Sequence, residues 1–350
     1  MEMRRKKKVL VVGSAEKSAG GVSSVIKLIK TLPVWNDYSC FWLGTQIQRN
    51  YLWKLWYAIK ANFISFFIMC RYDIVHFHTV PDKICLIIQL PIFLFALLWR
   101  RKIIMHVHMG NQLANHTNNQ LFLWCLNKSD VVVLLAKKWQ RLFEDKYPLV
   151  KTPTKVIYNA CEDVREVGME EKRKAIVMAA FFNENKAPDL LLKAWQSIHD
   201  KYPDWKVYML GNGEVDKYEK MSVQMGVADS VTFTGYIVGK EKEKYFRESS
   251  IYCMCSYEEG FPMVVLEAWA YGMCVVTTPV GGLPDVLENG KNSVVFDFGD
   301  WRQLASSLET LIENENLRRQ ISEYSRTFVY EHFSVKKTNE EISEMYDSLY

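Results

Sequence analysis

The sequence lacks the patterns that would define a disulfide scaffold, a zinc domain or a nucleoside triphosphatase. Its eight cysteines are scattered, with no CxxC pair and no histidine at zinc spacing, so we expect buried thiols of a reducing compartment. Neither GxGxxG nor the P-loop pattern occurs. The apolar run at 9–12 stops at Gly13 and is too short for a signal-peptide core, so we expect a buried first strand there.

The modest net charge of +4 hides an asymmetry between the two halves of the chain. Of the 350 residues, 24% are charged and 49% are hydrophobic, a mixture that excludes disordered and fibrous classes. Residues 1–165 contain 24 Lys and Arg against 10 Asp and Glu, whereas residues 166–350 contain 20 against 30. The basic half predicts an anionic partner, either a membrane surface or a nucleic acid. Nucleic acid is disfavoured, because the basic residues are spread out and no recognition motif accompanies them.

Apolar runs alternate with amphipathic segments along the whole chain, with a charged linker at 161–174. The runs predict strands at 9–12, 38–42, 73–78, 102–108, 131–135, 155–157, 175–180, 207–210, 231–234, 251–254, 274–277 and 294–296. The segments between them predict helices near 22–32, 47–70, 83–100, 117–128, 137–143, 187–199, 216–225, 240–249, 262–271, 300–313, 316–332 and 336–350. This alternation predicts two doubly wound parallel α/β domains, with ligands at the carboxyl ends of the strands in a central cleft.

Two segments have the residue types of a ligand site. The glycine-rich stretch 13–24, which includes Gly20 and Gly21, lies between the first strand and the first helix, where unpaired N–H groups favour an anion. A tight turn without a ligand is an equal alternative. In 258–270, Glu259 ends a loop and Glu267 lies within an apolar helix, so its carboxylate needs a partner. A ribose hydroxyl pair and a buried arginine are both suitable partners.

The second segment resembles the signature of the retaining glycosyltransferases of family four. Glu259 and Glu267 stand with seven residues between them in EGFP…LEA, and Lys186 precedes the helical stretch 189–195 in the same way as the phosphate-binding lysine of that family. The remaining matching stretches are 210–214, 231–236, 270–278, 280–285 and, more loosely, the glycine pair at 20–21. The resemblance implies the GT-B fold. It divides the chain into an acceptor-side domain at 1–165, a nucleotide-sugar domain at 166–335 and a helix at 336–350 that returns to the first domain.

The resemblance also implies roles for individual residues. Lys186 would hold the donor diphosphate, Glu267 the ribose, and Glu259 would lie by the donor sugar, with His108 as a second active-site residue. Backbone groups of the glycine turns and of a helix start would cradle the donor, at Gly20, Gly21, Gly211, Gly213, Gly260, Phe261, Pro262, Met263 and Val264. The chain has no DxD triplet, so no metal and no cofactor is implied, and the donor itself is expected to be linked to UDP or GDP.

One position departs from the family pattern. The family has an arginine five residues before the lysine, and this chain has Phe181 there. A guanidinium binds phosphate in a bidentate way, so its loss weakens donor binding unless Lys240 or Arg247 replaces it. The departure suggests one alternative to a transferase, a non-catalytic GT-B scaffold. A GT-B nucleotide-sugar epimerase is a second alternative, which the glycine loop and the carboxylate signature disfavour.

Histidines follow two predicted strands of the first domain. His76 alternates with His78, and His106 with His108, so each pair shares one face of its strand. We expect His76 and His106 to pack inside the domain, bonded to neighbouring loops. A metal site is disfavoured, because no carboxylate accompanies the four histidines.

The first domain also contains a basic and aromatic flank. Trp53, Trp56, Lys60, Phe63 and Phe67 recur at helical spacing, which suits a bilayer interface, although helices packed on the sheet are an equal alternative. The apolar stretch 84–99 contains Pro91 and is shorter than the ~20 residues of a membrane span. With the basic residues at 4–8 and 100–102, this flank predicts a peripheral protein at the cytoplasmic face of an anionic membrane. There it would act on a glycan or lipid-linked acceptor in polysaccharide synthesis.

Overall fold

The chain forms two compact units in the computed structural model, which describes residues 7–18, 20–47, 51–108, 110, 113, 119–164 and 172–350. The first unit comprises Met1–Ala160 and Val335–Tyr350, and the second comprises Cys161–Ser334. The predicted boundary between 165 and 166 lies outside the described residues, as do parts of the predicted linker, of the helices near 47–70 and 117–128, and of the basic stretch 4–8.

The first unit is built on a six-stranded parallel sheet with the order β2-β1-β3-β4-β5-β6. Its strands are β1 (Val9–Ser14), β2 (Phe41–Gln46), β3 (Ile74–Thr79), β4 (Lys102–Val107), β5 (Val131–Leu134) and β6 (Thr154–Val156). β1 pairs with β2 on one side and with β3 on the other, so the strand order reverses there. This reversal is the topological switch point of a doubly wound sheet, where ligands bind.

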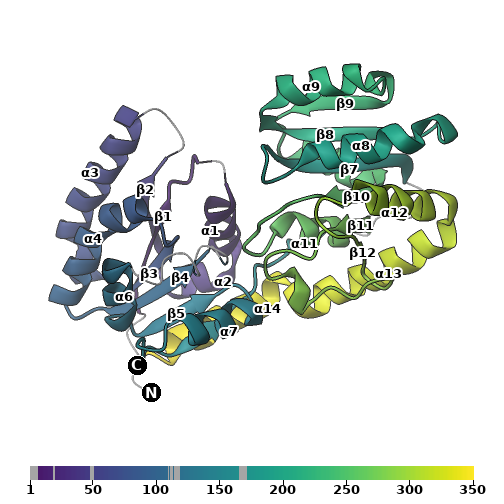
Figure 1. Cartoon of the computed structure of the whole chain (residues 1–350). Helices are drawn as coiled ribbons and strands as arrows, with labels where there is room; N and C mark the ends of the chain where they lie inside the picture. The colour runs from purple at the N-terminus through teal and green to yellow at the C-terminus, as the bar shows by residue number, and fades with distance from the viewer. Residues whose placement is uncertain are drawn as a thin grey trace. The chain divides into compact units, whose positions relative to one another are not determined.

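Helices cover both faces of this sheet (Figure 1). One face carries α1 (Gly21–Thr31), α2 (Pro33–Asp37) and α14 (Val335–Asp347), and Tyr346 of α14 reaches His76 of β3. The other face carries α3 (Tyr51–Ile68), α4 (Lys83–Leu98) and α6 (Gln120–Asn127), and Phe93 of α4 packs against Phe77 of β3. α7 (Lys137–Lys146) joins β5 to β6.

The second unit repeats the plan with the order β12-β11-β10-β7-β8-β9, again parallel throughout. Its strands are β7 (Arg173–Phe182), β8 (Lys206–Gly213), β9 (Val231–Gly235), β10 (Ser249–Met254), β11 (Cys274–Thr277) and β12 (Ser293–Val295). Here the order reverses between β7 and β10, so the loops that follow these two strands leave the sheet side by side.

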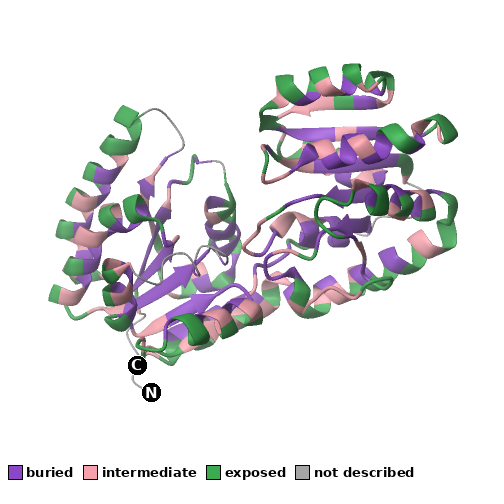
Figure 2. Cartoon of the chain, viewed as in Figure 1, coloured by how far each residue is buried: buried purple, intermediate pink, exposed green. Residues whose placement is uncertain are grey.

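A large apolar core holds α8 (Pro188–Ile198) and α12 (Trp301–Glu313) against this sheet. Trp195 of α8 and Phe182 of β7 are fully buried in it, as Figure 2 shows by the purple strands and inner helix faces. α9 (Val215–Gln224) follows β8. The opposite face carries α10 (Lys240–Glu248), α11 (Met263–Ala270) and α13 (Glu315–Phe333), with Trp269 packed on Phe328.

The two parallel sheets confirm the predicted fold class, and the differences are local. The strand predicted at 38–42 is β2 at Phe41–Gln46. It begins later than predicted because Pro33 starts the short helix α2, and Tyr38 is the C-cap of that helix. Proline at 91 lies inside α4 without ending it. All eight cysteines are free, but Cys70 is exposed rather than buried, since it lies in the 3-10 turn Met69–Arg71 at the surface.

Candidate functional site

The switch point of the second unit brings two predicted site residues together. Lys186 lies in the loop after β7, and Glu259 lies in the loop after β10. The Lys186 ammonium contacts Oε1 of Glu259, and both side chains are mostly covered, with exposed fractions of 24% and 14%. The Ser256 hydroxyl donates to the same carboxylate oxygen at 2.8 Å. This contact was not predictable from sequence spacing, because 72 residues lie between Lys186 and Glu259 and only the strand order makes them neighbours.

Asn185 fastens these two loops to each other. Its side-chain amide donates to the Glu258 carbonyl at 3.1 Å, and its side-chain oxygen accepts from the Glu258 N–H at 2.9 Å. Its backbone carbonyl also accepts from the Tyr257 N–H at 2.7 Å. The positions of Lys186 and Glu259 are therefore fixed by the residue that precedes the lysine. Sequence analysis missed Asn185, although an asparagine in a strand-to-helix loop is a common backbone-binding residue.

The glycine loop after β11 packs directly on the Glu259 backbone. Gly281 has a φ of +66°, and a Cβ there would lie 2.7 Å from the Glu259 carbonyl oxygen. The next residue, Gly282, donates its N–H to the Gly260 carbonyl at 2.8 Å. Any side chain at 281 would push the carboxylate loop away from the sheet edge.

Glu267 has a cationic partner that the sequence did not predict. It lies on α11, and its Oε2 is 2.6 Å from the ammonium of Lys242 on α10. Burial raises the pKa of the Glu267 carboxyl, and the Lys242 charge opposes that rise. Of the two partners considered for this carboxylate, a ribose or an arginine, the arginine was the wrong cation, because a lysine takes that place.

The start of α11 presents backbone rather than side chains. Pro262 precedes its first turn and provides no side-chain cap, so Met263 and Val264 bring first-turn N–H groups to this edge. The side chain of Phe261 is buried against Phe333, with ring centroids 5.5 Å apart. Met263 and Val264 are partly exposed. This helix start leaves an anion-favouring dipole end beside Glu259.

Gly211 and Gly213 end β8, where it lies closest to β7. A Cβ at Gly211 would lie 1.7 Å from the Ala180 carbonyl oxygen, and one at Gly213 would lie 2.4 Å from the Phe182 carbonyl oxygen. Both residues also have positive φ, at +155° and +105°. The glycines at these two positions are thus required by strand packing alone, whatever else they contact.

The two residues predicted as substitutes for the absent arginine, Lys240 and Arg247, both lie on α10. Phe181 is 56% exposed near the end of β7. Arg247 pairs with Glu243 at 3.0 Å within α10, and Lys240 begins that helix. Lys242, which was not predicted, is the residue of α10 that pairs with a predicted site carboxylate.

The remaining predicted residues, Gly20, Gly21 and His108, belong to the first unit. Gly20 is the N-cap of α1 with a φ of +134°, and its carbonyl accepts from the Ser23 hydroxyl at 2.8 Å. A Cβ built at Gly21 meets nothing within 4 Å, so this helix start is open. His108 follows β4 directly and is almost fully buried.

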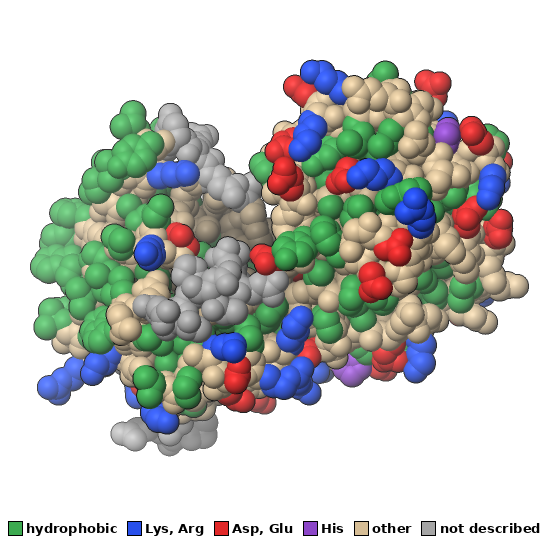
Figure 3. All heavy atoms as spheres, in the orientation of Figure 1, with side chains coloured by type: hydrophobic (Ala, Val, Ile, Leu, Met, Phe, Trp, Pro, Cys, Tyr) green, Lys and Arg blue, Asp and Glu red, His purple; other side chains and the backbone are tan. Residues whose placement is uncertain are grey.

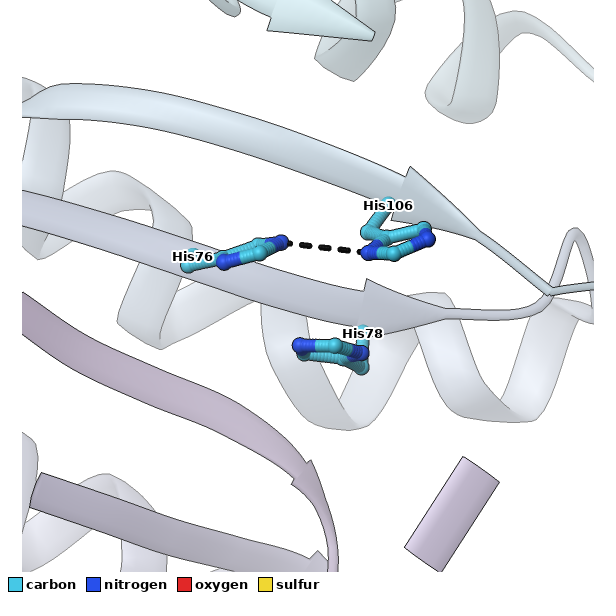
Figure 4. Close-up of side chains that lie close together, drawn as sticks. All are labelled: His76, His78 and His106. Carbon is cyan, nitrogen blue, oxygen red and sulfur yellow. Dashed lines mark hydrogen bonds between the residues drawn. The ribbon is translucent and has the colours of Figure 1, made fainter. Parts of the chain in front are cut away.

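Four histidines of the first unit form an array of paired rings rather than bonding to loops, which corrects our expectation for His76 and His106. Nε2 of His76 lies 3.3 Å from Nδ1 of His106, and Nδ1 of His78 lies 2.8 Å from Nε2 of His108. The two pairs stack on each other along β3 and β4, with His76 over His78 at 4.5 Å. Figure 4 shows three of these rings projecting from the two strands. Tyr346 of α14 completes the first pair, through a 2.8 Å bond to Nδ1 of His76.

This array does not have the geometry of a ready metal centre. Nitrogens of His76, His78 and His106 lie within 4.8 Å of one another, whereas ligands at ~2.1 Å from one zinc ion lie no more than ~4.2 Å apart. Nε2 of His76 is also engaged with His106, and the ring planes of His76 and His78 differ by only 29°, so their in-plane lone pairs do not converge. We therefore treat the cluster as a hydrogen-bonded core element.

The histidine array predicts that the first unit loses stability in mild acid. Burial lowers the pKa of all four histidines, that of His76 and of His108 to about 3 from an ordinary 6.5. Below pH 6.5 the unfolded chain therefore binds protons that the folded unit excludes. Stability should fall by about 1.4 kcal/mol per pH unit for each such histidine.

Denaturant unfolding followed by hydrogen exchange, from neutral pH down to about pH 5, measures this fall for each unit separately. Replacing His78 and His106 by glutamine should halve the pH slope of the first unit. The second unit is an internal control, because its histidines at 199 and 332 lie outside the array. An unchanged slope in the double variant would show that the array is not the origin of the acid sensitivity.

The second unit is similar to a known protein family. Residues 161–328 match the family of glycosyl transferases group 1. An uncharacterised glycosyltransferase of Haemophilus influenzae is 28% identical over 234 residues, which are 66% of this chain and 64% of that protein. The matched segments span less than two thirds of the first curated relatives, down to 46%.

Two solved structures have the same fold along nearly the whole chain. Anabaena HepE, in complex with UDP and glucose, superposes with a TM-score of 0.77 and 17% identity, covering 98% of this chain and 100% of that one. The lipopolysaccharide outer core galactosyltransferase WaaB superposes with a TM-score of 0.71 and 15% identity, with the same coverage. Residues 161–328 thus match the model of the glycosyl transferases group 1 family, in a chain that has the GT-B fold.

Proposed function

We propose that this chain is a retaining hexosyltransferase that moves a sugar from a UDP- or GDP-linked donor to a lipid-linked glycan in surface polysaccharide synthesis. The observation that carries the proposal is the contact between Lys186 and Glu259 at the switch point of a group 1 glycosyltransferase domain. A structural neighbour that binds UDP and glucose supports the donor class, and a galactosyltransferase of lipopolysaccharide supports the acceptor class.

Lys186 supplies the charge that the leaving group needs. As the bond between the sugar C1 and the donor phosphate breaks, negative charge develops on the diphosphate, and a fixed ammonium stabilises it. Because that ammonium contacts Glu259, a bound diphosphate would compete with the carboxylate for the same cation. Glu259 retains the Ser256 hydroxyl as a partner and is then free to accept hydrogen bonds from the donor sugar.

The carboxylate of Glu267 accepts hydrogen bonds from the ribose hydroxyls in this proposal. The Lys242 charge opposes the rise in the Glu267 pKa that burial causes, which favours the charged carboxylate, and a charged carboxylate is the stronger acceptor. Lys242 also places a cation of α10 beside α11. Its presence favours a transferase over the non-catalytic scaffold that Phe181 suggests.

The chemical step needs no nucleophile from the protein. The acceptor oxygen bonds to C1 on the face that the phosphate leaves, and a phosphate oxygen takes the proton of the acceptor hydroxyl. The first unit contributes His108 and the open helix start at Gly20 and Gly21, which in this proposal lie by the donor sugar and its phosphates. No step uses a metal or a cofactor.

A transfer assay tests this function. Membranes incubated with the enzyme and radiolabelled UDP- and GDP-sugars should yield a lipid-extractable labelled glycan with the anomeric configuration of the donor. Glu259→Ala should lower the rate by about 10²-fold, because the donor sugar loses its positioning carboxylate. Glu258→Ala is the matched control, since Glu258 uses its backbone rather than its carboxylate at this site. Equal transfer by wild type and Glu259→Ala would refute the assigned site.

The same assay separates the alternatives. Calorimetry that detects no binding of any UDP-, GDP- or ADP-sugar would favour the scaffold, and release of a rearranged nucleotide sugar without a new glycan would favour the epimerase. Transfer should persist in EDTA, and its loss there would contradict the metal-independent mechanism.

A further inference from the structure

The helix α3 has its amphipathic pattern reversed. A helix on the surface of a globular protein turns large apolar residues inward and polar residues outward. In α3 the buried residues are the small ones, Ala58, Ala61 and Ser65. Its large apolar side chains are exposed, among them Trp53, Trp56, Ile59, Phe63, Phe66 and Phe67. Trp56 is 56% exposed and Phe63 is 66% exposed, which is unusual for side chains of this size.

The neighbouring helix α4 extends this apolar surface. α3 and α4 lie side by side, joined by the 3.1 Å bond from the Asn62 amide to the Ile88 carbonyl and by packing of Phe66 on Phe95. The outward side of α4 exposes Ile84, Ile87, Leu94 and Leu98. Figure 3 shows the resulting band of hydrophobic side chains over these helices, and Figure 2 shows the same surface as exposed. We call this the α3–α4 face.

The charges around this face have one sign. Between residues 38 and 129 the only acidic residues are Asp73 and Asp82. Asp82 caps α4 by accepting from the Ile84 and Cys85 N–H groups, and Asp73 accepts from the Lys8 N–H. On α3, on α4 and in the turns that follow them, the exposed basic residues are Lys54, Lys60, Arg71, Lys83 and Arg100, and none of them forms an ion pair within the part of the chain that the structure describes.

We propose that the α3–α4 face docks on a bilayer that contains anionic lipid, with the apolar side chains inserted at the level of the headgroups. Tryptophan and lysine on one helix suit this layer, since the indole rings prefer it and lysine stems reach along apolar surface to the phosphates. Within the described residues no helix has the length and apolar content to cross a membrane. The pair α3–α4 therefore lies along the surface.

This placement explains why basic residues ring an apolar centre. A protein partner for the face would need an acidic rim to match these basic residues. Insertion makes the attachment mainly hydrophobic, whereas the basic half of the sequence alone suggests mainly electrostatic binding. Salt should thus weaken binding to vesicles only in part.

The face also reaches the ligand-binding edge of its own unit. β2 ends at Gln46 and α3 begins at Tyr51, so the first turns of α3 lie at the carboxyl edge of the sheet, where β4 leads into His108. A surface hollow lined by Leu52, Trp53 and Trp56 marks this end. Docking would bring lipid headgroups to the edge at which an acceptor enters, but the docking itself does not depend on the proposed transfer reaction.

Vesicle flotation tests this proposal. The full chain should float with vesicles of phosphatidylcholine mixed with phosphatidylglycerol, and more weakly with phosphatidylcholine alone. Trp56→Ser with Phe63→Ser should weaken flotation with both vesicle types by about tenfold or more, because two inserted aromatic side chains are lost. Lys54→Gln with Lys60→Gln should remove only the preference for phosphatidylglycerol. Leu149→Ser with Val223→Ser is the matched control, since both residues are exposed and lie off the face.

Several results would overturn the proposal. Equal flotation of wild type and the aromatic variant would exclude the face as the lipid contact. Absence of flotation, together with a dimer in sedimentation that the aromatic variant dissociates, would assign the face to a second copy of the chain. Thermal unfolding of each variant shows that it is folded. Because flotation requires no donor sugar, loss of transfer with flotation intact would contradict the proposed function alone.

Discussion

Lys186→Ala should lower the rate of sugar transfer by about 10²–10³-fold. The reason is that the lysine is the cation at the switch point of the second unit, where it contacts Glu259 and no arginine accompanies it at position 181. In a site with two cations on the diphosphate, losing one leaves the other. This chain has Phe181 in place of the first cation, so the Lys186→Ala variant lacks both cations that would stabilise the negative charge on the leaving diphosphate. Single-turnover kinetics should show the effect in the chemical step.

The control for this variant is Lys193→Ala. Lys193 lies on α8, just beyond the same loop, and pairs with Asp189 at 2.8 Å on the helix itself. Its removal costs at most a surface ion pair and should leave transfer unchanged. Lys186→Arg should recover part of the activity, because it keeps the charge but changes its geometry. A Lys186→Ala enzyme that retains more than a tenth of wild-type activity would mean that another cation, such as Lys242, neutralises the diphosphate.

Gly211→Ala should destabilise the second unit by about 3–5 kcal/mol. The added methyl would lie 1.7 Å from the Ala180 carbonyl oxygen, and that oxygen is backbone of β7, so relief requires the neighbouring strands β7 and β8 to separate. The positive φ at Gly211 adds strain of its own. Denaturant unfolding of the purified variant measures the change in free energy.

Gly226→Ala separates these two contributions. Gly226 has a φ of +72°, but a Cβ built there meets nothing within 4 Å. The only expected cost of Gly226→Ala is therefore the strain of an alanine at positive φ, which should lower the free energy of unfolding by about 1 kcal/mol. If Gly211→Ala costs no more than Gly226→Ala, β7 and β8 adjust without difficulty, and the glycine at 211 is then explained by ligand contact rather than by packing.

The fold class could be predicted from the sequence because the same pattern, a buried strand followed by an amphipathic helix, repeats along the chain. Each buried strand is a short apolar run between amphipathic segments, and parallel strands buried on both faces are where such runs are most distinct. The prediction failed where a local feature competed with that pattern, as at Pro33, which inserts α2 and moves β2 three residues along the chain. Strand order was not predictable in this way, since it depends on which runs pair.

The candidate site was predictable as a set of residue types and not as a set of contacts. Lys186, Glu259 and Glu267 stand in recognisable local patterns, but their partners come from distant loops and helices. Lys242 is one charge among several on a lysine- and glutamate-rich helix, so only the packing of α10 on α11 distinguishes it. The α3–α4 face was equally ambiguous, because a run of apolar residues does not say which side of the helix meets the sheet.

The position of α14 has a consequence for how the chain is made. The first unit is discontinuous, since Cys161–Ser334 is inserted between its sheet and its last helix. Until α14 has left the ribosome, His76 lacks the Tyr346 hydroxyl, and the part of the sheet face that α14 covers remains exposed. The first unit is therefore synthesised first but completed last. The inserted second unit can fold its own core before α14 packs on the first unit.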